Sequence, residues 1–176
     1  AQNEQELEQI WHTGNWAVIG TVDPVQPQKL QSPKPYWLQR AAELADLILI
    51  EADGSKRLPC KVPASHEPVI LPQTDVVISV LGLSALNRPL KDCCFRLEKA
   101  TELLSVTESH PLTREHMATI FASGQGLRKA TNNSEYVVVL NQCDNEDRKN
   151  AGEQISDILC GLDPTINHII LTKLHP

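Results

Sequence analysis

Apolar residues in this chain gather in short runs that predict the strands of a sheet. The runs lie at residues 16–22, 47–52, 75–81, 136–140 and 168–172. Most of them are unbroken, and an unbroken apolar run indicates a strand that is buried on both faces, as in a parallel sheet. We expect the run at 47–52 to be such a strand.

Between these runs, apolar residues recur at the spacing of amphipathic helices. The predicted helices lie at residues 4–12, 36–45, 95–104, 114–124 and 146–162. Thr113 and Asn145 precede the last two and are residue types that cap helix N-termini. Strands alternating with helices predict a three-layer α/β/α domain with a mostly parallel sheet, and the length fits a single domain over residues 1–176.

The stretch from residue 47 to 74 stands apart because its strand leads into a long, basic, proline-containing loop. In α/β proteins, acidic residues followed by such a loop often build a site at the carboxyl end of the sheet. A charged surface connection is the alternative. Loops of this length are usually functional or disordered, which favours a site.

Composition narrows the classes of function. Hydrophobic residues make up 41%, charged residues 22%, and the formal net charge is −6, as in ordinary globular proteins. The negative charge gives no general electrostatic case for binding nucleic acid or an anionic membrane. No apolar run is long enough to span a bilayer, and the polar start AQNEQELEQI is unlike a secretory signal.

Cysteine usage favours a reduced, cytoplasmic protein. The count is 5, an odd number, and the positions lack the spacing of a disulfide framework. Cys93 and Cys94 are adjacent rather than in a C-x-x-C pair, so a redox or metal role stays open beside a structural one.

The first candidate motif is Glu51-Ala-Asp-Gly54, directly after the run at 47–52. A carboxylate at the end of a strand can hold hydrated Mg²⁺ beside the phosphates of a nucleotide, because oxygen ligands suit that hard cation. Gly54 would let a backbone N–H approach the terminal phosphate. Alternatively, the carboxylate pairs with Lys56 or Arg57, or caps a helix.

The second candidate motif is Asn141-Gln142-Cys143-Asp144, which follows the run at 136–140. It resembles the N-K-x-D element of GTP-binding proteins, in which the Asp accepts two hydrogen bonds from guanine. Two fixed acceptors distinguish guanine from adenine, since the wrong base would leave buried polar groups unpaired. Gln142 stands where that element has Lys, and Asp144 could instead belong to a helix cap with Asn145.

Residues 51–90, EADGSKRLPCKVPASHEPVILPQTDVVISVLGLSALNRPL, closely resemble the signature region of the selenium-dependent hydroxylase accessory proteins, the YqeC-like family. The resemblance continues at Gly126-Leu127-Arg128 and at LNQCD, and covers residues 16–162. Members resemble P-loop nucleoside triphosphatases, with a Rossmann-like fold that begins with a strand and a G-x-G-G-K-T-T loop. The 176 residues contain no G-x-x-x-x-G-K-[ST] loop, so we expect that this first strand and P-loop were either removed or lost.

The resemblance implies Mg²⁺ and GTP or ATP as cofactors. It implies catalytic roles for Glu51 and Asp53, with Glu51 also on the metal. The implied nucleotide-binding residues are Gly54, Lys56, Lys61, His66, Asn141 and Asp144. Glu67 would line the same site, and His66 could also act as an acid or base.

The function that the resemblance implies is a nucleotide-dependent accessory or maturation factor for a selenium-dependent molybdenum hydroxylase, an NTPase in its complete form. That hydroxylase would be the partner. The alternative is a non-catalytic α/β module that binds a partner or an anion through its basic loop.

Overall fold

The computed structural model describes residues 4–14, 16–131 and 133–173. The chain divides into two compact units, Ala1–Ile50 and Glu51–Pro176, and each is described by itself. No helix in the described ranges is long and apolar enough to cross a membrane. Whether residues 1–176 behave as one domain stays a prediction.

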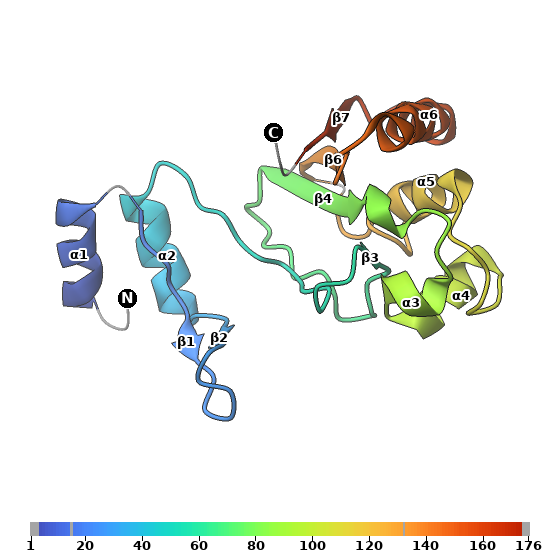
Figure 1. The fold of residues 1–176 in the computed structure, drawn as a ribbon. Coiled ribbons are helices and arrows are strands. Elements are labelled where there is room, and N and C mark those ends of the chain that lie inside the picture. The colour runs from blue at the N-terminus through green and yellow to red at the C-terminus, as the bar shows by residue number, and fades with distance from the viewer. Residues whose placement is uncertain (1–3, 15, 132, 174–176) are drawn as a thin grey trace. The chain divides into compact units, whose positions relative to one another are not determined.

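The first unit holds two helices and one small hairpin (Figure 1). The helices α1 (Glu4–Thr13) and α2 (Pro35–Leu44) confirm the two predicted helices. Between them, β1 (Thr21–Val22) pairs antiparallel with β2 (Leu30–Gln31). The predicted strand at 16–22 is therefore wrong except at its end. Asp23 starts a turn there, since its carboxylate accepts hydrogen bonds from the N–H groups of Val25 and Gln26.

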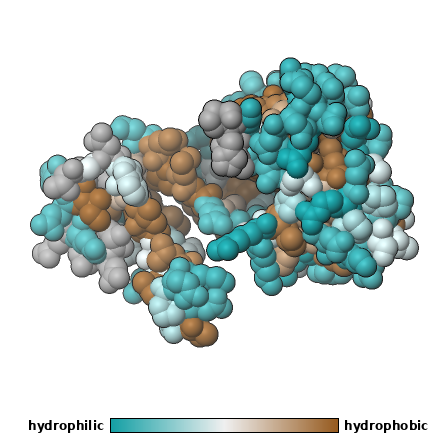
Figure 2. Space-filling model, in the orientation of Figure 1, coloured by the Kyte–Doolittle hydropathy of each residue, from teal (hydrophilic) through white to brown (hydrophobic). Residues whose placement is uncertain are grey.

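The predicted buried strand at 47–52 is also wrong. Residues 47–52 form no strand, and Leu47 and Leu49 are 74% and 81% exposed. An apolar run becomes a strand when a neighbouring strand pairs with it, and no described strand pairs with this one. Within the described part of this unit the buried side chains are Leu7 and Ala41, and hydrophobic residues gather on its visible face in Figure 2.

The second unit is built on a parallel sheet, which confirms the predicted α/β class with a mostly parallel sheet. Its strands are β4 (Val76–Gly82), β6 (Glu135–Asn141) and β7 (His168–Leu171), in the order β4-β6-β7. The register aligns the ends of β4 and β6, with Gly82 opposite Asn141. A separate short parallel pair joins β3 (Cys60–Lys61) to β5 (Cys94–Phe95).

The helices of this unit follow local sequence signals. They are η1 (Leu83–Ala85), α3 (Leu90–Cys93), α4 (Leu97–Leu104), α5 (Arg114–Ala122) and α6 (Glu146–Leu162). Both predicted caps are confirmed. The Thr113 hydroxyl accepts from His116 N–H at 3.3 Å, and the Asn145 side chain accepts from Arg148 N–H at 2.9 Å.

The two faces of the main sheet differ. Helices α5 and α6 lie on one face (Figure 1), where Leu81, Val138 and Leu140 are buried with the core residues of α5. On the opposite face Ile78 and Val80 of β4 are 57% and 50% exposed. The predicted burial of both faces is therefore wrong for β4. A third layer stays a prediction.

Candidate functional site

At the carboxyl end of the main sheet, the loop of residues 51–74 passes close to the second predicted motif. Gly82 ends β4, lies opposite Asn141, and donates its N–H to the Pro59 carbonyl at 2.7 Å. A side chain at Gly82 would collide with the Gln142 amide oxygen and approach Pro59 Cβ to 3.0 Å. Glycine at this position therefore lets the signature loop, residues 51–74, pass close to the Asn141–Gln142 segment.

Lys61 is the centre of the signature loop. Its side chain is 5% exposed, and Nζ lies 3.1 Å from Asp53 Oδ2, 3.1 Å from Glu67 Oε2 and 2.9 Å from the Gly54 carbonyl. Three acceptors match the three N–H bonds of an ammonium group. Lys61 thus joins distant parts of the loop through internal ion pairs, and its predicted role in nucleotide binding stays a prediction.

Glu67 is the second member of this network. Its Oε2 also accepts from Ala64 N–H at 3.0 Å, and its Oε1 lies 3.2 Å from Arg96. Burial would raise the pKa of Glu67, but the hydrogen bonds from Ala64, Arg96 and Lys61 outweigh it and lower the pKa to about 2. Because its pKa is so low, the carboxylate of Glu67 is a poor general base.

Lys129 holds the same loop from the other side. Its Nζ donates to the carbonyl oxygens of Ala64, Ser65 and Glu67 at 2.8, 2.7 and 2.8 Å. Neutral carbonyls around an ammonium fix the backbone of the loop without adding a counter-charge. Lys61 and Lys129 together determine where residues 53–67 lie.

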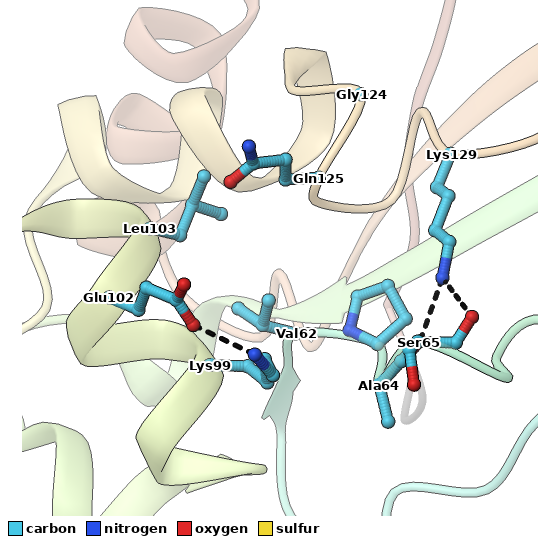
Figure 3. Close-up of a pocket in the computed structure, with 10 residues that line it drawn as sticks. Val62, Ala64, Ser65, Lys99, Glu102, Leu103, Gly124, Gln125 and Lys129 are labelled. Atoms are coloured by element: carbon cyan, nitrogen blue, oxygen red, sulfur yellow. Dashed lines mark hydrogen bonds and ion pairs between the residues drawn. The ribbon is translucent and has the colours of Figure 1, made fainter.

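A shallow cavity of about 240 Å³ adjoins this part of the loop (Figure 3). Val62, Ala64 and Ser65 face α4 residues Leu103 and Glu102 across it, with Lys129 at its rim. Its other two charged groups, Lys99 and Glu102, are paired with each other at 2.8 Å. None of the predicted nucleotide-binding residues lines this cavity.

Three cationic side chains lie near the ring of Phe95. Its ring centroid lies 5.0 Å from Lys56 Nζ, 5.6 Å from Lys61 Nζ and 4.7 Å from Arg96 Cζ, distances typical of cation–π contacts. Lys56 and Arg57 are exposed and have left-handed backbone angles, with φ of 52° and 64°. The side chains of Lys56 and Arg57 in this basic loop are therefore accessible to an anion in solution.

Glu51 and Gly54 lie together on the exposed side. A Cβ added to Gly54 would be 3.9 Å from Glu51 Oε1 and would meet nothing closer, so the fold itself does not require glycine there. Glu51 is an exposed carboxylate, while Asp53 is occupied by Lys61. One carboxylate beside substrate phosphates is a donor set that suits Mg²⁺. The described residues form no group of three or more acidic, His or Cys side chains able to hold a metal unaided.

The Asn141–Asp144 motif is held both by neighbouring residues and by residues distant in the sequence. Asn141 Oδ1 accepts from Gln142 N–H and from the Thr172 hydroxyl, at 2.8 and 2.9 Å, which ties β6 to the end of β7. Gln142, with φ of 63°, directs its amide oxygen to the Ser84 hydroxyl. Asp144 Oδ2 pairs with Arg148 at 3.0 Å, and Asn145 rather than Asp144 caps α6.

The predicted site residues therefore fall into three groups. Asp53, Gly54 and Lys61 are in direct contact, and Lys56 joins them through Phe95. The remaining predicted residues are held separately: Glu51 and His66 are exposed on the loop, and Asn141 and Asp144 lie in the second motif. Their roles in binding a nucleotide stay predictions.

Sequence reasoning missed Phe95, Arg96 and Lys129 as parts of this site. Lys129 lies 62 positions from Glu67 in the chain, and its turn looked like solvated polar sequence. Arg96 lay inside the predicted helix at 95–104, so no sequence signal pointed to its role in this site. It adopts a left-handed φ of 65° there, which turns the chain from β5 into α4.

Comparisons with known proteins agree with the signature region. The family model described as YqeC protein matches residues 1–98. Uncharacterized protein YqeC of Escherichia coli (strain K12) is 32% identical over 85 residues, which are 48% of this chain and 33% of that relative. The chain thus spans about a third of the length of the curated relative it matches. No solved structure matches it significantly.

The family match ends at residue 98, so the resemblance at Gly126–Arg128 and at the Asn141–Asp144 motif stays a prediction. The matched residues include the whole signature loop, with Lys61 and both of its carboxylate partners. Because the family model covers more than half of the 176 residues, the resemblance expected from the sequence is confirmed, and the chain belongs to the YqeC family.

Proposed function

We propose that this chain is the nucleotide-responsive part of an accessory factor that matures a selenium-dependent molybdenum hydroxylase in the cytoplasm. The observation that carries the proposal is the meeting of the signature loop with the Asn141 motif at the carboxyl end of a parallel sheet. Ligands of α/β proteins bind at that end. The finer fold assignment, a P-loop NTPase-like domain, belongs to the same proposal.

In this proposal each exposed group has one task. Glu51 would hold Mg²⁺, and Lys56 and Arg57 would neutralise phosphate oxygens, since all three are exposed on the same loop. Asp144 would accept hydrogen bonds from guanine in exchange for its bond to Arg148. Lys61, Glu67 and Lys129 would keep the loop in place while these groups bind GTP or ATP. Mg²⁺ would supply charge neutralisation at the phosphates.

Fluorescence titration with mant-GTP and mant-ATP, with and without Mg²⁺, tests this function. We expect Glu51→Gln to remove the Mg²⁺ dependence. Asp144→Asn should weaken mant-GTP about ten-fold while leaving mant-ATP unchanged, because one guanine acceptor is lost. Glu153→Gln, an exposed carboxylate on α6, is the matched control and should change neither.

The titration is run on the chain and on a version extended at its N-terminus by a G-x-G-G-K-T-T loop. If neither binds a nucleotide at millimolar concentration, the nucleotide role is wrong. If both bind but Glu51→Gln and Asp144→Asn behave as the control does, the assignment of these two residues is wrong.

A non-catalytic anion- or partner-binding module is the second candidate, and the exposure of Lys56 and Arg57 beside a fully satisfied ion network favours it. It predicts that pyrophosphate binds this chain without Mg²⁺ and that Lys56→Ala with Arg57→Ala abolishes the binding. Lys149→Ala with Lys173→Ala, two exposed lysines elsewhere, should leave it intact. Strict Mg²⁺ dependence would decide for the nucleotide proposal.

A further inference from the structure

The short parallel pair β3–β5 places two cysteine thiols side by side. Cys60 and Cys94 are direct partners in the register of these strands, and they are 1% and 3% exposed. Neighbouring strands lie about 4.7–4.9 Å apart, which is inside the range of Cα separations that a disulfide bridges. Both cysteines are thiols in this structure.

The remaining cysteines are placed differently. Cys93 directs its sulfur away from this pair, toward the Pro89 carbonyl at 3.3 Å and the Arg88 carbonyl at 3.8 Å. Cys143 and Cys160 lie outside β3 and β5, and Cys160 is exposed. The sequence did not decide whether the adjacent Cys93 and Cys94 act together. In the structure they have different neighbours, and Cys94 lies opposite Cys60.

The two thiols are not equivalent. The hydrogen bond from the Cys60 thiol lowers the pKa of Cys94. The same hydrogen bond, together with burial, raises the pKa of Cys60. A thiol with a lowered pKa holds more thiolate and is the nucleophile, and its neighbour is placed to react second.

We propose that Cys60 and Cys94 are a reversible dithiol–disulfide pair that locks the signature loop to the start of α4. Residues Lys61 and Phe95 immediately follow the two cysteines, and Lys61 is the residue that joins both ends of the loop. A covalent bond one residue away from that ion network keeps β3 against β5 even when the network opens. The pair does not depend on nucleotide binding.

The oxidant is a peroxide, which is small enough to reach a buried thiol. The Cys94 thiolate attacks one oxygen of hydrogen peroxide, the O–O bond breaks, and the hydroxide released takes up the thiol proton to become water. The Cys60 sulfur then attacks the sulfur of the Cys94 sulfenic acid, and the S–O bond breaks as the S–S bond forms. The second hydroxide leaves with the Cys60 proton as water. Two thiols and one peroxide thus give one disulfide and two waters.

Peptide mass mapping of the chain after hydrogen peroxide treatment tests the pair, in a Cys160→Ser background that prevents links between molecules. We expect a peptide that joins Cys60 to Cys94, an intact mass lower by about 2 Da, and recovery of both thiols with dithiothreitol. Trypsin should cut after Lys56 and Arg57 about ten-fold more slowly in the oxidised chain, because local opening is restricted.

Cys93→Ser is the matched control, since it changes a buried neighbouring thiol, and it should keep the link. Cys60→Ser and Cys94→Ser should each abolish it. The proposal is overturned if Cys60 and Cys94 stay reduced at a peroxide concentration that oxidises Cys160 in the unchanged sequence, or if fragmentation of the linked peptide shows that Cys60 is bonded to Cys93 instead of Cys94. Peptide mapping of the Cys160→Ser chain alone decides the matter where a further variant fails to fold.

Discussion

The two segments at the carboxyl end of the sheet are held in opposite ways. The signature loop depends on contacts between residues far apart in sequence, such as Lys129 with Glu67 and Arg96 with Glu67. The Asp144–Arg148 segment is held by neighbours within four positions, through the Asp144–Arg148 pair and the Asn145 cap. The loop should therefore respond strongly to single charge changes, and the second segment weakly.

The largest effect should come from Lys61. Lys61→Met leaves Asp53 and Glu67 without their shared cation, and breaking a buried ion pair costs about 3–5 kcal/mol of the free energy of unfolding. Urea denaturation followed by circular dichroism measures the loss. Lys99→Met removes an exposed pair with Glu102 and should cost far less than Lys61→Met, because solvent screens exposed pairs. Similar losses for both variants would mean that the loop is not held by Lys61.

Acid should weaken the loop next. The pKa of Glu67 is lowered in the folded chain to about 2 from 4.5, so the folded state favours the carboxylate. Its stabilisation is present above pH about 4.5 and is lost as the pH falls toward 2. Contact with solvent reduces the loss to about 2–3 kcal/mol. Glu67→Gln should flatten this part of a stability profile measured between pH 2 and 6, and an unchanged profile would contradict the assignment.

Removing Lys129 should have a smaller, local effect. Lys129→Met leaves three carbonyl oxygens without their donor, at an expected cost of about 2 kcal/mol, because partly buried acceptors lose their partner. Hydrogen exchange should accelerate at the amide of Glu67, which bonds to the Ala64 carbonyl. Lys149→Met, at an exposed lysine 4.0 Å from Glu146, should leave that amide unchanged.

The second segment should show the smallest effects. Asn145→Ala removes the cap of α6 and should cost about 1 kcal/mol in thermal or urea denaturation. Asp144→Asn breaks a partly exposed pair with Arg148 and should cost about 0.5 kcal/mol or less. A larger loss for Asp144→Asn than for Lys61→Met would reverse the contrast between the two segments.

Local signals predicted most of the second unit. Thr113 and Asn145 cap the helices that they were expected to cap, and the runs at 75–81 and 136–140 became β4 and β6. The same reasoning failed at 47–52, because a strand needs a partner that its own sequence does not contain. The internal ion pairs of Lys61 could not be predicted either, since a lysine that points inward and one that points outward look alike in a sequence.

The sequence by itself determined the family, the positions of the longer helices and the motifs that end in Gly54 and Asp144. Helix caps and apolar periodicity act over a few residues, so they can be recognised without the fold. Only the tertiary structure decided which cations are internal and which are exposed. Lys61 and Lys56 are five positions apart, yet the acceptors around Lys61 come from both ends of the loop and become its neighbours only when the chain folds.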